Sequence, residues 1–118
     1  MMIFDKGVTV YLYREPVDFR KQINGLSVLV QDGMAIDPFT ESLFVFSNRH
    51  RNRIKILYWQ RNGFCLWMKR LEKDKFSWPK HLHNNDILTL TSEELQWLLD
   101  GFDIWKKPPH QRLIYAAV

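Results

Sequence analysis

The apolar positions of this chain repeat with a period of two in some stretches and with a period near 3.6 in others, which predicts both strands and helices. Runs rich in β-branched and aromatic residues predict strands over residues 8–12, 43–47, 53–60, 64–72 and 87–90. Only short turns separate the three central runs. These runs are therefore expected to form an antiparallel meander around residues 43–72.

A first helix is predicted over about residues 16–32. Its apolar stripe consists of four residues at spacings of four, three and four: Phe19, Ile23, Leu26 and Val30. Pro16 suits the first turn of a helix, and Asp18 suits the positive end of the helix dipole. Gly33 offers a stop.

A second helix is predicted over about residues 92–101. Thr91 and Glu94 have the spacing of a capping box, in which the threonine hydroxyl and the glutamate carboxylate each bond a free backbone N–H. Three leucines then share one side of the helix and are expected to be buried: Leu95, Leu98 and Leu99.

The dipeptide Asn62-Gly63 predicts a two-residue type I′ turn between the second and third strands of the meander, because both central residues of that turn need a positive φ. This turn sets the expected register. It pairs Arg61 with Phe64, Trp59 with Leu66, Leu57 with Met68, Lys55 with Arg70 and Arg53 with Glu72. One end of that sheet face would then be basic.

The 118 residues are expected to form one α+β domain over 1–118, in which a twisted antiparallel sheet packs against one or two helices. The tail, about residues 106–118, is expected to be mobile. No segment approaches the roughly 20 apolar residues that span a bilayer, so no membrane partner is expected. The single cysteine, Cys65, interpreted as a small packed hydrophobe, indicates a reduced, cytoplasmic setting.

Positive charge is concentrated in the middle of the chain. Residues 49–80 contain ten basic and two acidic residues, a balance of +8, whereas the rest has seven basic and eleven acidic residues, a balance of −4. Such asymmetry steers a phosphate backbone toward one region and predicts a nucleic-acid partner. The candidate nucleic-acid-binding residues are Arg49, Arg51, Arg53, Lys55, Arg61, Lys69, Arg70, Lys73 and Lys75. A protein surface is the competing partner for this patch.

Aromatic residues lie among these basic residues. Trp59, Trp67 and Trp78 are candidates for stacking on bases or for contact with a partner, although a core role is favoured for a strand-borne tryptophan in a small domain. Arg20 and Lys21 lie off the apolar stripe of the first helix. They are candidates for partner contact, with simple solvation of the helix face as the favoured alternative.

No sequence feature supports catalysis by this chain. The scattered aspartates show no spacing that would hold a pair of divalent metals, and neither a phosphate-binding loop nor a dinucleotide motif is present. His81-x-His83 lacks the partner motif of a zinc site and is interpreted as a surface loop. No enzymatic activity, metal or cofactor is therefore expected.

Two segments resemble the TnpB-type accessory proteins of the IS 66 family of bacterial insertion sequences. They are YLYREPVDFRKQINGL at 11–26 and FVFSNRHRNRIKILYWQRNGFCLWMKRLEKDKFSWP at 44–79. The closing Leu-Thr-Ser-Glu-Glu-Leu and Gly101-Phe-Asp are also similar to that family. The resemblance implies a noncatalytic protein that is encoded beside a separate transposase and is required for transposition.

Three hypotheses for the molecular role follow. In the first, the basic hairpin over 49–75 binds DNA through its phosphates, which makes binding tolerant of sequence and sensitive to salt. In the second, the same sheet or the helix with Arg20 and Lys21 docks on the transposase, and DNA contact is incidental. A weaker third possibility is binding of RNA on the aromatic-rich sheet.

Overall fold

The computed structural model describes residues 5–79 and 86–105. The expectations for the tail over 106–118 and for His81 and His83 fall outside these residues. Eight elements follow one another: β1 (Thr9–Tyr13), α1 (Ile23–Val28), η1 (Leu29–Gly33), β2 (Ser42–Ser47), β3 (Arg53–Gln60), β4 (Gly63–Arg70), β5 (Ile87–Leu90) and α2 (Ser92–Leu99).

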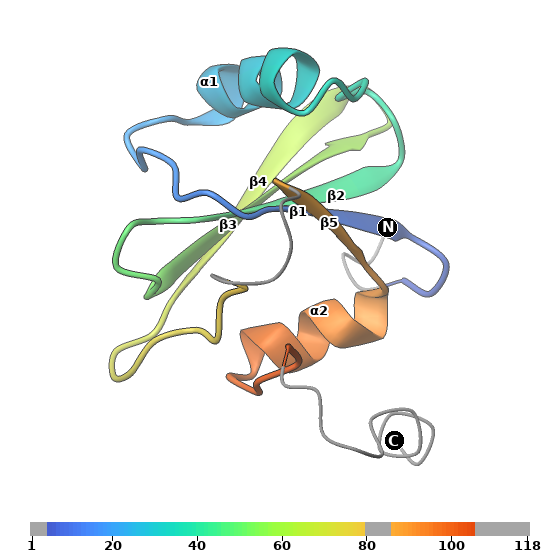
Figure 1. Cartoon of the computed structure of the whole chain (residues 1–118). Coiled ribbons are helices and arrows are strands. Elements are labelled where there is room, and N and C mark those ends of the chain that lie inside the picture. The colour runs from blue at the N-terminus through green and yellow to red at the C-terminus, as the bar shows by residue number, and fades with distance from the viewer. Residues whose placement is uncertain (1–4, 80–85, 106–118) are drawn as a thin grey trace.

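The five strands form one sheet in the order β4-β3-β2-β1-β5. β2, β3 and β4 are the predicted antiparallel meander. β1 runs parallel to β2 and antiparallel to β5, so the sheet is mixed. α1 covers one face of the sheet and α2 covers the other (Figure 1). The expected α+β fold is confirmed.

A separate apolar core lies on each face of the sheet. On the α2 side, Val10, Val45 and Ile56 come from the neighbouring strands β1, β2 and β3 and pack with the leucines of α2. On the α1 side, Phe44 and Leu57 pack against Leu26 and its neighbours. The central strands are buried on both faces, as β2 shows by being buried at all six positions.

The predicted start of the first helix is wrong. Residues 16–22 are irregular, and the first helical bond runs from the Leu26 N–H to the Gln22 carbonyl at 2.9 Å. Asp18 instead forms a local turn, since its carboxylate accepts the Arg20 N–H at 2.9 Å. The helical stretch ends at Gly33 through a wider turn, η1, in which the Met34 N–H bonds the Leu29 carbonyl.

The predicted register of the β3–β4 hairpin is also wrong, by two residues. Gln60 pairs with Gly63 and Trp59 with Phe64, so the turn consists of Arg61 and Asn62. Arg61 has the positive φ of 58°, and the Asn62 N–H bonds the Gln60 carbonyl at 2.6 Å. This bond closes a γ-turn over residues 60–62 within the two-residue loop, and the structure adopts it in place of the turn that Asn-Gly prefers. It brings the ring of Trp59 edge-on to that of Phe64, with centroids 5.0 Å apart.

The capping box that opens α2 is confirmed. The Thr91 hydroxyl accepts the Glu94 N–H at 3.1 Å, and the Glu94 carboxylate accepts the Thr91 N–H at 2.9 Å. Within residues 5–79 and 86–105, no helix has the length and apolar character needed to cross a membrane.

Candidate nucleic-acid interface at one end of the sheet

Three loops meet at one end of the sheet, on the left in Figure 1: residues 14–22, 48–52 and 71–76. Backbone hydrogen bonds fasten them together: Val17 N–H to the Ser47 carbonyl at 2.9 Å, Leu71 N–H to the Asn52 carbonyl at 2.8 Å and Phe76 N–H to the Arg51 carbonyl at 2.7 Å. We call the surface formed by these loops and by the adjoining Arg53 and Arg70 the three-loop surface.

Two asparagines fix the shape of the middle loop. The Asn48 side-chain oxygen accepts the N–H groups of Asn52 and Arg53, each at 3.1 Å, and its amide donates to the Asn52 side-chain oxygen at 2.7 Å. Arg51 can then hold a positive φ of 59° at the tip. Asn48 and Asn52 were not among the residues singled out from the sequence, although asparagine in a turn is a known signal for such local bonds.

Most of the candidate basic residues gather on the three-loop surface. Arg49, Lys73 and Lys75 are exposed, and Arg51 and Arg53 are half-buried. None of these five forms an ion pair with an acidic residue in the described part of the chain. Their charges are therefore available to an anionic partner.

Arg53 and Arg70 lie directly opposite each other on β3 and β4. Like charges in this position are destabilising. Arg70 is partly compensated by Glu72, whose carboxylate lies 2.8 Å from its Nε. A phosphate between the two guanidinium groups would relieve the same repulsion.

Arg20 and Lys21 extend the basic surface along the α1 side, because both lie on the loop over 14–22. Arg20 is paired with Asp18, with the Arg20 Nε at 3.0 Å and 3.1 Å from the two carboxylate oxygens. The guanidinium lowers the pKa of Asp18 to about 2. Lys21 has an exposed side chain.

Two of the candidate lysines serve the fold. Lys55 is only 4% exposed, and its ammonium donates to the carbonyls of Phe19 and Lys21, each at 2.8 Å. Burial, followed by the charge of Arg53, lowers the pKa of Lys55. The Lys69 ammonium donates to the carbonyl of Leu99, the last residue of α2, at 2.8 Å, where a cation complements the helix dipole.

Arg61 lies away from the other candidates, in the turn at the far end of the β3–β4 hairpin. The eight residues of β3 place this turn roughly 26 Å from the three-loop surface. Lys6 lies near Arg61, since both line the same shallow hollow. Any contact made by Arg61 would therefore belong to another surface.

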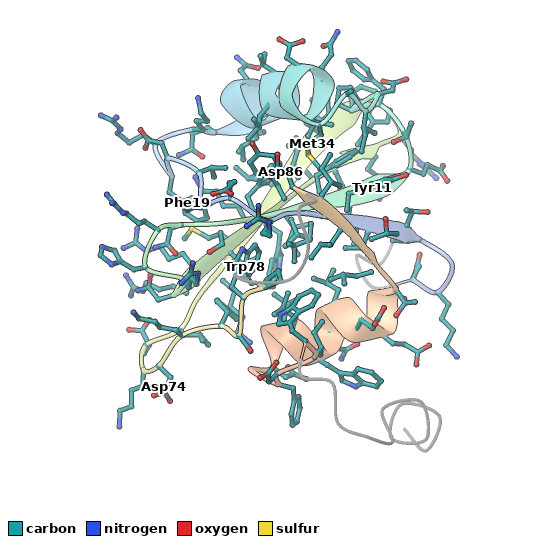
Figure 2. All side chains as sticks on the ribbon, viewed as in Figure 1. Tyr11, Phe19, Met34, Asp74, Trp78 and Asp86 are labelled. Atoms are coloured by element: carbon teal, nitrogen blue, oxygen red, sulfur yellow. The ribbon has the colours of Figure 1, made fainter. Side chains whose placement is uncertain are left out.

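The three candidate tryptophans occupy different environments. Trp78 is 6% exposed, lies between the sheet and α2 (Figure 2), and donates its indole N–H to the Arg14 carbonyl at 2.7 Å. Trp67 is half-buried and packs on the same α2-side core. Trp59 lies at the turn end with Phe64 and with Phe39, which is 55% exposed. Phe39 was not a candidate from the sequence, and no residue pattern signalled it.

Within residues 5–79 and 86–105, no group of three or more histidine, cysteine or acidic side chains could hold a metal ion. The one described cysteine, Cys65, is free and half-buried.

Residues 8–109 match the family model described as IS66 Orf2 like protein. The chain is 34% identical over 110 residues to the uncharacterized protein y4jC of Sinorhizobium fredii, with 91% of this chain and 92% of that relative covered. It is 29% identical over 108 residues to y4hO, another uncharacterized protein of the same organism, with 92% and 91% covered. No solved structure matches the chain.

Proposed function

Because this chain belongs to the IS66 Orf2-like family, which is tied to insertion-sequence transposition as an accessory component, we propose that it is a noncatalytic accessory protein that binds duplex DNA. Binding would occur at the three-loop surface, where arginines and lysines neutralise phosphates and release their counterions. Phosphate contacts of this kind position a protein on DNA without reading its sequence.

The observation that carries this proposal is the meeting of two sequence-distant basic stretches on one rigid surface. Arg49, Lys73 and Lys75 lie on two loops that are joined by backbone hydrogen bonds, and none has an acidic partner among the described residues. Arg53 and Arg70 add a like-charged pair beside them. Exposed charges that are mostly positive, on loops of fixed shape, suit a ligand with regularly spaced anions.

The contributing set is narrower than the run of basic residues in the sequence. Lys55 and Lys69 already donate to backbone carbonyls, so we leave them out of the proposed DNA-binding set. Arg61 is left out because it lies at the other end of the sheet. The proposed set is Arg49, Arg51, Arg53, Arg70, Lys73 and Lys75, with Lys21 and Arg20 at its margin.

Docking on the element's transposase is the second candidate function, and one observation favours it. Phe39, Trp59 and Phe64 form a cluster of rings with centroids 4.9 to 5.2 Å apart at the end opposite the basic loops. Phe39 is 55% exposed there, next to the acidic Asp37 and Glu41. An exposed aromatic cluster with acidic as well as basic neighbours, Asp5 and Glu41 beside Lys6 and Arg61, fits a protein partner better than a phosphate backbone.

The two functions are separated by titrating the purified chain alone against fluorescently labelled duplexes. One duplex carries the element's end sequence and the other is unrelated, and each anisotropy titration is run at two salt concentrations. Binding that weakens steeply with salt supports the proposed DNA contact, and tighter binding of the end duplex would add specificity. Folded protein that binds neither duplex, yet is retained by immobilised transposase, would replace this proposal with the adaptor function.

A further inference from the structure

β4 forms an open edge of the sheet that carries few of the usual protections. It has eight residues, Gly63–Arg70, and pairs only with β3 in the described part of the chain. It contains no proline, and its charges are confined to Lys69 and Arg70 at one end. A long edge of this kind readily accepts another strand. The opposite edge, β5, has only four residues.

The free backbone groups of this edge can be assigned. The Leu71 N–H bonds the Asn52 carbonyl, which continues the β3–β4 ladder and shows that the odd-numbered residues of β4 face β3. The even-numbered residues therefore present their N–H and C=O groups outward: Phe64, Leu66, Met68 and Arg70. Because side chains alternate along a strand, these same residues share the α1 face of the sheet.

The side chains of these positions make an apolar margin beside the open edge. Met68 is 53% exposed, and Leu66 contributes to a shallow hollow of about 780 Å³ under the start of α1. Phe64 and Leu66 are half-buried against the α1-side core. A strand added to β4 would cover Met68 and shield the apolar side chains beside the open edge from solvent.

We propose that a second copy of this chain occupies the edge, with the two β4 strands antiparallel and Leu66 on the two-fold axis. In this register Phe64 lies opposite Met68 of the partner subunit, and the sulfur can contact the ring. Lys69 lies opposite Gly63 of the partner subunit, and Arg70 lies opposite Asn62 of the partner subunit. Neither charge meets a like charge.

The charge pattern disfavours two of the alternative arrangements. A parallel pairing in register would place Lys69 and Arg70 beside their own copies, and like charges opposite each other are destabilising. A shift that places Phe64 opposite Leu66 of the partner subunit would bring Lys69 opposite Arg61 of the partner subunit. The shift in the other direction pairs as many residues of β4 and also opposes no like charges, but it places Arg70 opposite Phe64 of the partner subunit. The proposed register is preferred because it sets the exposed Met68 against that aromatic ring instead.

If the proposed DNA contact also holds, this pairing places two three-loop surfaces at opposite ends of the joined strands. The strand rise puts each surface roughly 20 Å from the axis, so the two are separated by roughly 40 Å. One turn of B-DNA spans about 34–36 Å, so both surfaces could contact one face of a duplex. The dimer itself does not depend on DNA binding.

The first test is sedimentation velocity of the full chain, in which the wild type is compared with a variant that carries an added charge on the β4 edge. The wild-type chain is expected at twice its mass of 14.3 kDa. Met68→Lys should sediment as a monomer, because the new charge would lie against the partner's ring. Val28→Lys is the matched control, since Val28 is 54% exposed on α1 and the added charge is equal. Circular dichroism confirms that both variants are folded.

A wild-type chain that stays monomeric up to its solubility limit overturns the proposal. So does a dimer that Met68→Lys leaves intact, or one that both substitutions dissociate equally.

The second test fixes the register through disulfide formation, in a Cys65→Ser background. Residues on the axis in a hydrogen-bonded pair have Cα atoms about 5.5 Å apart, within reach of a disulfide. Leu66→Cys should therefore cross-link to a covalent dimer on mild oxidation. Met68→Cys should not, because its copy would lie about 14 Å away. Cross-linking through Met68→Cys alone would overturn the register.

Discussion

Lys55 and Phe19 are joined in two ways across 36 residues of sequence. The Lys55 ammonium donates to the Phe19 carbonyl at 2.8 Å and lies 4.8 Å from the centroid of the Phe19 ring. Its second hydrogen bond goes to the carbonyl of Lys21. One buried cation thus holds the loop over 14–22 against the sheet, which is the loop that carries Arg20.

We expect Lys55→Met to lower the free energy of unfolding by about 2 kcal/mol, because hydrogen bonds to a charged donor are removed while the apolar stem is kept. The matched control is Lys21→Met, whose exposed side chain should change stability little. Urea denaturation followed by tryptophan fluorescence measures both. Equal stabilities for the two variants would show that the buried ammonium contributes nothing to holding the loop.

The same contact explains why the start of the first helix could not be predicted. Pro16 and Asp18 are good helix-start signals, but the carbonyls of Phe19 and Lys21 are used by Lys55. The Val17 N–H is likewise tied to the end of β2. These partners come from distant parts of the sequence, so no local pattern announces them. The later part of the apolar stripe is confirmed, since Leu26 and Val30 are buried, whereas Phe19 lies before the helix and is only partly buried against the same core.

The β3–β4 hairpin shows a different limit to prediction from the sequence. A shift of two residues keeps every side chain on its own face of the sheet, so the predicted division of residues between faces is correct although the register is not. Only the turn distinguishes the two registers. The observed one has the ring contact between Trp59 and Phe64 and leaves Arg53 opposite Arg70. Only the turn preference of Asn62-Gly63 favoured the predicted register.

The sequence showed where the basic residues of the candidate site are concentrated, but it showed only in part which of them lie together on the surface. The high density of lysine and arginine identified the basic stretch. It could not show that the ammonium groups of Lys55 and Lys69 would donate to backbone carbonyls within the fold. The predicted hairpin did place Arg61 beside the turn, away from Arg53, and the structure agrees. The roles of Lys55 and Lys69 depend on which loops and helix ends lie against the sheet, which is a property of the folded chain.

Asn48→Ala should weaken both the fold and the proposed DNA contact. The substitution removes three hydrogen bonds that shape the loop over 48–52, at a cost of about 1–2 kcal/mol. Because Arg49 and Arg51 lie on this loop, affinity for duplex DNA is expected to fall several-fold even under conditions where the variant is fully folded. Asn62→Ala, in the exposed turn at the other end, is the control. If Asn48→Ala leaves the affinity for DNA unchanged, DNA binding does not depend on the shape of this loop.

Trp78→Phe tests whether this indole is structural. The substitution removes the hydrogen bond to the Arg14 carbonyl and leaves space in the α2-side core, so stability should fall by roughly 1–3 kcal/mol. The affinity of the folded protein for DNA should stay as it is. Chemical denaturation and anisotropy on the same sample measure the two quantities. Weaker DNA binding at unchanged stability would restore Trp78 as a contact residue.

Asp18 should titrate well below its ordinary pKa of 3.8, at about 2. The depressed pKa means that the ion pair stabilises the fold above about pH 3.8 and that this contribution is lost as the pH falls toward 2. Arg20→Ala should move the pKa of Asp18 up toward 3.8, whereas Lys21→Ala should change it far less. The carboxyl ¹³C shift of Asp18 reports the titration. A wild-type midpoint near 3.8 would contradict the pairing.

The proposed DNA contact makes its sharpest prediction when equal charge is removed from the two ends of the sheet. Arg49→Gln with Lys75→Gln takes two positive charges from the three-loop surface. Lys6→Gln with Arg61→Gln takes two from the opposite end, so both doubles have the same net charge. The first pair should weaken duplex binding and reduce the slope of log K against log salt by about 0.9 for each phosphate that is no longer neutralised. The second pair should leave the slope near that of the wild type.

All four side chains are exposed, so neither double should unfold the protein. Comparison of the slopes therefore separates a located interface from general attraction by a chain of net charge +4. Equal weakening in both doubles would mean that net charge alone drives binding. Greater weakening from the Lys6 and Arg61 double would move the interface to the turn end, beside the Phe39 and Trp59 rings.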